Sequence, residues 1–336
     1  MRRRDRVICT VLGDGGWGTA LAIHLHRAGH QVRWWGAFPE YLKELDRRRA
    51  NRKFLPGIRI PPGIRIEPSL AQAVSGAHLV LLAIPSQHLR AVTKRLAPLR
   101  RSLRKAIVVS VAKGLEQGSL MRMSQIIHDE MGAVRLVVLS GPSIASEVAK
   151  GHPASLVAAS HERGLAQAVQ RWVMNGSLRI YTSADVAGVE LGGALKNPVA
   201  IAAGVGDGLG FGANAKAALI TRGIVEMARL GKTLGAREQT FWGLSGLGDL
   251  VTTCLSGRNR WLGEQLGRGR YLRSILASTP MVIEGVATAK AAAALGRRHK
   301  VELPIIEQVC AILFRRRVPR AALRALMLRA GKPESA

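Results

Sequence analysis

Short apolar runs alternate with longer amphipathic stretches along the first half of the chain. The runs are rich in β-branched residues, which predicts strands at 6–12, 31–36, 78–84, 106–111, 136–140, 154–158 and 178–181. Between them, apolar residues recur at helical spacing over 17–28, 39–49, 87–96 and 120–130. This alternation is typical of βαβ units and predicts an α/β domain with one doubly wound (Rossmann-type) parallel sheet. A Pro- and Gly-rich stretch at 55–68 interrupts the rhythm and predicts a surface loop.

The pattern changes after residue 183. From there Ala, Leu, Gly and Arg recur at helical spacing, with Gly-rich breaks and no further β-rich run. This shift predicts a sheet domain over residues 1–183 and an all-α domain over residues 184–336. Gly188, Gly192 and Gly193 predict a helix that either lets a neighbour approach closely or stays flexible.

The end of the chain, residues 314–329, is a basic stretch with helical spacing. We expect Leu323, Leu326 and Met327 to pack against the second domain, and Arg320 and Arg324 to face water.

Composition narrows the class of protein. The chain has 336 residues, of which 47% are hydrophobic and 21% charged, as in ordinary folded proteins with room for two domains. Fifty Lys and Arg against 22 Asp and Glu leave a net charge of +28, which favours anionic partners. Phosphorylated small molecules, nucleic acid and an acidic lipid surface are the candidates. Because the basic residues are spread out and not interleaved with aromatic ones, we expect no nucleic acid.

Three absences add to the picture from composition. The longest apolar stretches fall well short of the roughly 18 residues that a membrane span needs, so no span is expected. The three cysteines form no CxxC pair, which indicates a reducing, cytoplasmic compartment. The nine histidines form no metal-binding pattern, so no metal is expected. A homodimer is one assembly that the sequence leaves open.

A glycine-rich turn follows the first predicted strand. Gly13, Gly15 and Gly18 form a GxGxxG pattern, with a strand before it and a helix after it, which is the context of a dinucleotide site. The glycines permit a tight turn, the approach of a pyrophosphate and close packing of helix on strand, while the helix N-terminus offers N–H donors. The alternative is a purely structural Gly-rich turn.

The end of the second predicted strand carries the usual selector between NAD and NADP. An acidic residue there would bind the ribose 2′-hydroxyl of NAD. Here the residues are RWWGAF (33–38), with no carboxylate before Glu40. The NAD signature is therefore missing, and Arg33 favours NADP if it faces a 2′-phosphate; on a strand it has other directions open, so both cofactors stay candidates.

Seven sequence blocks, in order, carry a family resemblance: VLGDGGWGTALA, VAKGLE, LSGPSIASEVAKG, ELGGALKNPVAIAAGVGDGLGFGANAKAALITRG, GLSGLGDLVTTC, GRNR and VIEGVATAK. From Val7 to about Pro304 the chain resembles the bacterial, soluble, NAD(P)-dependent sn-glycerol-3-phosphate dehydrogenases. The resemblance implies an oxidoreductase that transfers hydride reversibly between NAD(P)H and dihydroxyacetone phosphate. The product, sn-glycerol 3-phosphate, would supply glycerophospholipid synthesis.

The resemblance also implies roles for individual residues, with Lys196 as the catalytic general acid/base. The implied substrate contacts are Lys113, Gly141, Ser143, Lys196, Asp249, Gly257, Arg258 and Asn259. The implied cofactor contacts are Gly13, Gly15, Gly16, Trp17, Gly18, Ala37, Lys113, Ala145, Arg258, Val282 and Glu284.

Lys196 also has a reading from the residues alone. Pro198 removes a backbone donor two residues later, which predicts a helix that opens at this point. A surface lysine is the alternative reading. To act as an acid and a base near neutral pH, Lys196 needs a pKa below the usual value of about 10.4, and we expect burial and the cations Lys113 and Arg258 to provide that.

Three positions depart from the family pattern. Asp14 stands where the family commonly has a small residue, and it would repel a pyrophosphate unless its side chain points away. Ala37 replaces a polar or basic residue, so one adenosine contact is expected to be lost. Gly257 replaces a serine, whose role Ser256 is a candidate to take over.

Two other functions stay open at this stage. One is a related two-domain dehydrogenase acting on another hydroxy acid, although we would not expect it to share GFGANAKAALITRG or the RNR block. The other is a binder of nucleic acid or of an anionic membrane surface, for which the net charge is the only argument.

Overall fold

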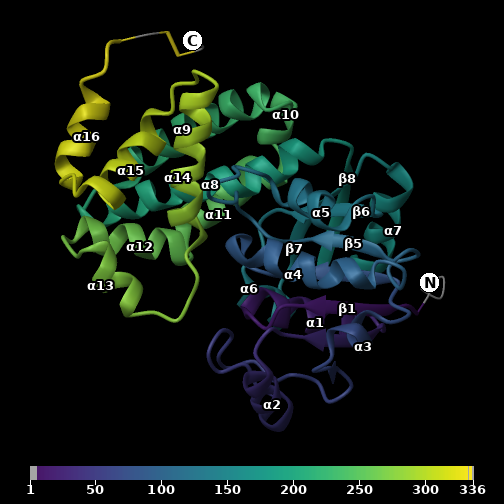
Figure 1. The fold of residues 1–336 in the computed structure, drawn as a ribbon. Coiled ribbons are helices and arrows are strands. Elements are labelled where there is room, and N and C mark those ends of the chain that lie inside the picture. Colours follow the sequence, from purple (N-terminus) through teal and green to yellow (C-terminus); the bar gives the residue numbers. More distant parts are fainter. Residues whose placement is uncertain (1–5, 332, 335–336) are drawn as a thin grey trace.

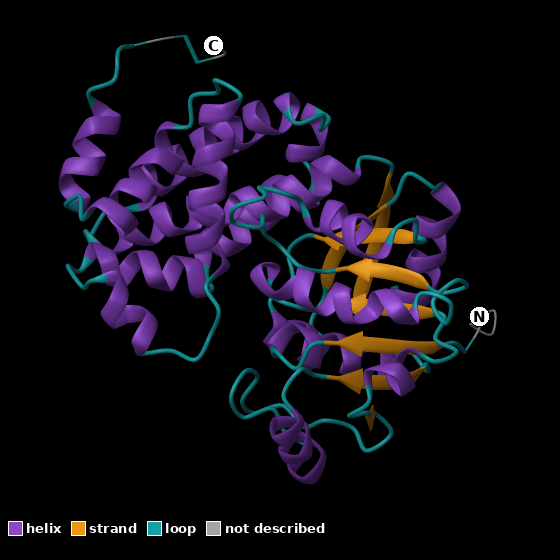
Figure 2. Ribbon diagram, in the orientation of Figure 1, coloured by secondary structure: helices purple, strands orange, loops and turns teal. Residues whose placement is uncertain are grey.

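The computed structural model describes residues 6–331 and 333–334. The N-terminal part is a β-sheet flanked by helices, and the C-terminal part consists of helices (Figures 1 and 2). The strands are β1 (Ile8–Leu12), β2 (Gln31–Trp35), β3 (Arg65–Ile66), β4 (Leu79–Leu82), β5 (Ile107–Ser110), β6 (Leu136–Ser140), β7 (Ala154–Ala159) and β8 (Leu178–Ser183). All seven predicted strands are present, and β3 is an additional one. Within the described ranges, no helix has the length and apolar character needed to cross a membrane.

The sheet has the strand order β3-β2-β1-β4-β5-β6-β7-β8. Every neighbouring pair is parallel except β6 and β7, which are antiparallel. The predicted doubly wound parallel sheet is therefore confirmed, with this one pair as an exception. The link between the two strands contains only the short helix α6 (Ala145–Lys150), and the chain reverses its direction there.

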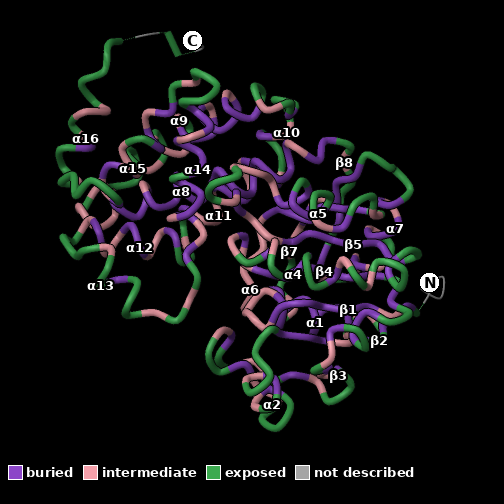
Figure 3. Tube along the Cα trace, viewed as in Figure 1, coloured by how far each residue is buried: buried purple, intermediate pink, exposed green. Residues whose placement is uncertain are grey.

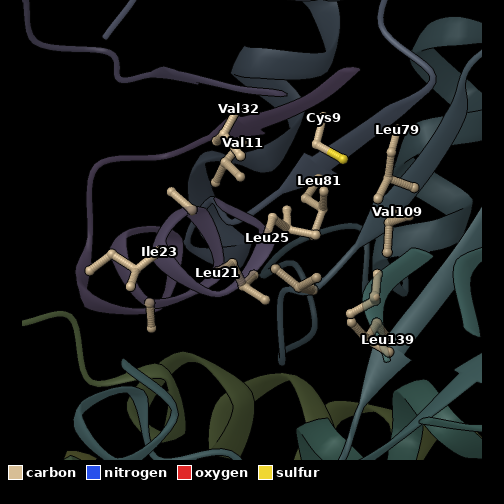
Figure 4. Packing of buried hydrophobic residues seen from close by; sticks show 14 of the residues in the cluster. Cys9, Val11, Leu21, Ile23, Leu25, Val32, Leu79, Leu81, Val109 and Leu139 are labelled. Atoms are coloured by element: carbon tan, nitrogen blue, oxygen red, sulfur yellow. The ribbon is translucent and has the colours of Figure 1, made fainter. Parts of the chain in front are cut away.

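Helices cover both faces of the sheet, as the doubly wound prediction requires. One face carries α1 (Gly16–Arg27), α2 (Pro39–Arg48), α6 and α7 (Arg163–Val173). The other face carries α3 (Leu70–Val74), η1 (Ser86–His88), α4 (Leu89–Leu96), η2 (Ala97–Leu99) and α5 (Met123–Met131). Figure 4 shows the first of these layers, where α1 side chains such as Leu21 and Leu25 lie against Val11 and Leu81 of the strands.

The stretch at 55–68 is only partly a surface loop, contrary to the prediction. Leu55, Ile60 and Ile64 are buried in the core beside α1 and β2, and residues 65–66 form the edge strand β3. The prolines and glycines indicated a loop, but the apolar side chains between them pack into the core and fix this segment there. Trp34 and Trp35 of β2 are also buried and belong to the core.

The C-terminal part is entirely helical within the described residues. Its elements are α8 (Val186–Gly208), α9 (Ala213–Thr233), α10 (Glu238–Phe241), the π-helical turn η3 (Leu244–Gly248), α11 (Asp249–Leu255), α12 (Arg258–Gly267), α13 (Leu272–Ala277), α14 (Glu284–Arg298), α15 (Pro304–Arg315) and α16 (Pro319–Met327). The boundary between residues 183 and 184 lies between β8 and α8, and as a domain boundary it stays a prediction.

Helix α8 lies at the centre of this part and is buried along most of its length. It continues through Pro198 without a break, so the prediction of an opened helix is wrong. Proline removes only one backbone donor, and the helices packed around α8 keep it intact.

Helices α8 and α12 touch backbone to backbone. A Cβ on Gly204 would lie 1.9 Å from the carbonyl oxygen of Arg260, and one on Gly263 would lie 2.0 Å from that of Ile201. Only glycine fits at these two positions. The contact fixes where α12 begins relative to α8, and both helices contribute residues to the site described below.

The C-terminal helix α16 covers the outer side of α15 (Figure 1). Leu323 and Leu326 are partly buried, and Arg320 and Arg324 are exposed as predicted. Met327 is 75% exposed, so its predicted packing is wrong. Figure 3 shows this helix as one of the more exposed parts of the chain, because it contacts the rest of the protein along one edge only.

We expect Gly204→Ala to lower the free energy of unfolding by about 1–3 kcal/mol, because the new methyl group would overlap the backbone of α12. Gly206→Ala, in the same helix, is the control: its Cβ would meet only Phe211, at 3.8 Å. There alanine should be neutral or stabilise by about 0.5–1 kcal/mol. Urea denaturation of both variants checks this, and equal unfolding free energies would contradict the close contact.

Candidate active site

The glycine-rich turn lies at the carboxyl end of β1, next to the end of β4, where the strand order of the sheet reverses direction. In open α/β sheets, ligands bind at such a switch point. Gly13 has φ +124°, and a Cβ there would lie 2.2 Å from the carbonyl oxygen of Ala83. A Cβ on Gly18 would lie 2.1 Å from the carbonyl oxygen of Gly13. Two of the three motif glycines are thus required by close backbone contacts.

Helix α1 begins in this turn and points its N-terminus at the switch point. The backbone N–H of Thr19 bonds to the carbonyl of Gly15, so the first N–H groups of the helix, at residues 16–18, lack an intrahelical acceptor. The Cβ of Ala145 lies 3.9 Å from the position of a Cβ on Gly16, at the start of α6. These donors suit a pyrophosphate, so the residues present fit a dinucleotide cofactor. Ala37 is exposed just beyond β2.

A second group of residues lies beyond the ends of β5 and β6. Asp249, at the start of α11, bonds to two lysines: its Oδ2 is 2.7 Å from Nζ of Lys113, and its Oδ1 accepts a hydrogen bond from Nζ of Lys196. Lys113 also donates to the carbonyl of Gly141 at 2.8 Å and to Oγ of Ser143 at 3.2 Å. Two cations against one carboxylate leave a net positive charge, which favours an anionic ligand.

Lys196 is 5% exposed and Asp249 is 1% exposed. Burial lowers the pKa of Lys196 to about 7; Asp249 opposes this effect and Lys113 adds to it. The expectation from sequence is confirmed for burial and for Lys113, whereas Arg258 is not among the causes. Lys196 can therefore exchange a proton near neutral pH.

Glycines on α8 make room for this group. A Cβ on Gly193 would lie 2.5 Å from Oγ of Ser140 and 3.5 Å from Cγ of Lys113, and one on Gly192 would lie 2.7 Å from the carbonyl of Ser245. The predicted close approach at these glycines is confirmed. Because α8 carries no side chains at these glycines, its backbone can be approached by β6, Lys113 and the turn before Asp249.

Thr253 is a member of this group that the sequence analysis missed. Its Oγ1 accepts a hydrogen bond from Nζ of Lys196 at 2.7 Å and donates one to the carbonyl of Asp249, also at 2.7 Å. Thr253 lies four residues after Asp249, so both face the same side of α11. This four-residue spacing is the feature of the sequence that could have identified Thr253.

Hydrogen bonds between side-chain amides connect the N-terminus of α12 to the residues around Lys196. Nδ2 of Asn259 donates to Oδ1 of Asn197 at 2.8 Å, and Nδ2 of Asn197 donates to the carbonyl of Lys113 at 3.3 Å. Gly257 precedes the helix with φ +104°, and Arg258 is exposed beside it. A guanidinium at a helix N-terminus fits the geometry and charge of a phosphate. Ser256 donates to the carbonyl of Thr252 at 3.4 Å.

The last group connects the two parts of the chain. Glu284, at the start of α14, accepts hydrogen bonds from the backbone N–H of Ser86 at 3.0 Å and from its hydroxyl. Burial raises the pKa of Glu284, and the bonds from Ser86 oppose that shift. Arg258 donates to the carbonyl of Val282 at 2.8 Å. Ser86, like Thr253 and Asn197, was not singled out from the sequence.

Comparison with known proteins supports one family. Residues 8–166 match the N-terminal model, and residues 185–324 the C-terminal model, of NAD-dependent glycerol-3-phosphate dehydrogenase. The glycerol-3-phosphate dehydrogenase [NAD(P)+] 2 of Salinibacter ruber is 46% identical over 97% of this chain and 95% of its own length. The enzyme of the same name from Geobacillus kaustophilus is 47% identical over 96% of this chain and 95% of its own.

A solved structure agrees with these relatives. The crystal structure of glycerol-3-phosphate dehydrogenase from Coxiella burnetii superimposes with a TM-score of 0.92 at 36% identity, and the match covers 96% of this chain and 99% of that one. The family models, the relatives and the fold thus agree over nearly the whole length. The chain belongs to the NAD-dependent glycerol-3-phosphate dehydrogenase family.

Proposed function

We propose that this protein catalyses reversible hydride transfer between NAD(P)H and dihydroxyacetone phosphate, giving sn-glycerol 3-phosphate. Family membership supports the reaction, and the observation that carries the mechanism is the buried Lys196, held by Asp249 and Thr253 between the sheet edge and α12. The product would supply glycerophospholipid synthesis.

The substrate phosphate binds at the N-terminus of α12. There Arg258 offers its charged fork, and the first N–H groups of the helix offer further donors. Asn259 is held by Asn197, so the phosphate-binding end lies at a fixed position relative to Lys196. Gly257 leaves the backbone accessible at this point. Val282 positions Arg258 through its carbonyl oxygen.

The carbonyl group of the substrate lies between the two lysines. When bound, the nicotinamide supplies or accepts the hydride at its C4. In the direction of reduction, the ammonium form of Lys196 donates its proton to the oxygen on C2 and is left as a neutral amine. In the direction of oxidation, the neutral amine takes that proton back. Asp249, which also pairs with Lys113, holds Lys196 in place, and the three groups carry a net positive charge while Lys196 is protonated.

The glycine-rich turn and the N-terminus of α1 would hold the pyrophosphate of the cofactor. Gly13, Gly15, Gly16, Trp17 and Gly18 line the turn, and Ala145 closes its other side. Ser86 lies in η1, which follows β4, and Glu284 is the first residue of α14. Both would contact the nicotinamide end of the cofactor. We also propose that the protein is cytoplasmic, because its three cysteines are unpaired. The assembly that we propose is a homodimer.

The proposed reaction is tested by following oxidation of NADH and NADPH at 340 nm. Dihydroxyacetone phosphate should be reduced, while dihydroxyacetone, which lacks the phosphate, should react far more slowly. In the same assay, Arg258→Leu should raise KM for dihydroxyacetone phosphate about tenfold or more, since a charged hydrogen bond is lost. Equal rates with both ketones would contradict the proposed phosphate site.

Lys196→Arg should lower kcat by about a hundredfold or more, nearly as much as Lys196→Ala, because arginine keeps its charge but cannot release its proton. Binding of NADH, measured by calorimetry, should be unchanged in both variants. Turnover close to that of the parent protein in Lys196→Arg would show that another group moves the proton.

The low pKa of Lys196 predicts opposite pH dependences for the two directions. Oxidation of glycerol 3-phosphate needs the neutral amine, so kcat/KM should rise as the pH increases through about 7. Reduction of dihydroxyacetone phosphate needs the ammonium, so kcat/KM should fall over the same range. Since Asp249 raises the pKa of Lys196, Asp249→Asn should move both inflections to lower pH. Profiles that are flat between pH 6 and 9 would exclude Lys196 as the titrating group.

A further inference from the structure

Asp14, in the middle of the glycine-rich turn, does not point its carboxylate along the turn. Its side chain instead lies against Gly36, the residue directly after β2. Oδ2 of Asp14 is 2.5 Å, and its Cγ 2.7 Å, from the position of a Cβ on Gly36. The carboxylate thus occupies the space that a side chain at the end of β2 would fill, and glycine at position 36 leaves that space open.

This carboxylate has an unsatisfied acceptor. Oδ2 of Asp14 is buried and has no hydrogen-bond partner among the described residues, although the residue as a whole is partly exposed. Burial raises the pKa of Asp14, and a hydrogen bond from its own backbone N–H and the charge of Lys53 oppose that shift. No cation in the described part of the chain lies within ion-pair distance of it. Because Oδ2 is closed to solvent while Asp14 as a whole is partly exposed, the open part of the side chain is what a ligand can reach, and a hydroxyl group there can donate a hydrogen bond to the carboxylate.

In the dinucleotide-binding fold, the end of β2 is where an acidic residue binds the ribose hydroxyls of NAD. The sequence has no carboxylate there, and Ala37 offers neither charge nor hydrogen bonds. Building on the proposed function, we propose that Asp14 takes over this role from the glycine-rich turn: its carboxylate accepts hydrogen bonds from the adenosine ribose and makes the enzyme prefer NAD over NADP.

The cations near the end of β2 do not oppose this assignment. Arg33, the sequence-based candidate for a 2′-phosphate, donates from Nη1 to the carbonyl oxygens of Gln72 and Ser75 and so faces α3. Nζ of Lys53 lies over the rings of Tyr41 and Phe54, at 5.9 and 5.1 Å from their centroids. A 2′-phosphate at this position would meet the carboxylate of Asp14 first, and like charges repel.

The test measures binding of NADH and NADPH by calorimetry, without substrate, so it is independent of turnover. The unmodified protein should bind NADH at least about tenfold more tightly than NADPH. Asp14→Ala should weaken NADH binding about tenfold or more and leave NADPH binding unchanged or tighter. Asp14→Asn keeps an acceptor but removes the charge, so it should mainly improve NADPH binding.

Glu40→Ala is the matched control. Glu40 is the first carboxylate after β2 in the sequence, but its side chain is 85% exposed and pairs with Lys43, so its removal should change neither affinity. Lys53→Ala tests the opposite assignment, in which that lysine binds a 2′-phosphate. Thermal melts of all variants show whether they are folded.

The outcomes are distinguishable. If NADH and NADPH bind equally well, if Asp14→Ala leaves their ratio unchanged, or if Lys53→Ala selectively weakens NADPH binding, the role of Asp14 is refuted while the proposed function stands. If neither dinucleotide binds to the folded protein, the proposed function itself fails.

Discussion

The arrangement of the site depends on one buried carboxylate that holds two lysines. Asp249 is almost completely buried, and without cations its charge would be very costly at that depth. Lys113 reaches it from the sheet and Lys196 from α8. The two lysines thus compensate the charge of the buried carboxylate. The group therefore links the sheet to the helical part of the chain at the proposed site of the chemistry.

The glycines of α8 are the structural condition for this link. A central helix with ordinary side chains would keep the sheet edge and α12 at a distance, whereas Gly193 lets Lys113 approach and Gly204 lets α12 touch the backbone. Glycine normally weakens a helix, by about 1 kcal/mol relative to alanine. In α8 that loss is offset by burial on nearly all sides. The lack of side chains on this surface also allows the hydrogen bond from Asn259 to Asn197, which fixes the position of the proposed phosphate site relative to Lys196.

Local patterns predicted much of this protein, and contacts distant in sequence account for the errors. Strands and helices of the first half follow from periodicity, because buried strands and amphipathic helices leave their pattern in a few adjacent residues. The antiparallel direction of β7 depends on how its connection crosses the sheet, which no local pattern records. Thr253 was missed because its partner is on another helix. Met327 was misplaced because a helical pattern does not reveal how far the neighbouring surface extends.

The polar contacts between sheet and helices explain how two separate parts of the chain can share one reaction. Glu284 binds Ser86 beside the proposed cofactor site, while Glu190 of α8 accepts bonds from the backbone N–H of Ser124 at 2.7 Å and from its hydroxyl at 2.6 Å. Hydrogen bonds are directional, so these pairs fix orientation as well as distance, which apolar packing alone does less well. Hydride transfer requires donor and acceptor carbons at a defined separation, and errors of about 1 Å are costly. Contacts of this kind on both sides of the lysine pair hold the proposed cofactor and substrate sites in register, so that hydride would reach the carbonyl carbon while the buried Lys196 lies beside the carbonyl oxygen.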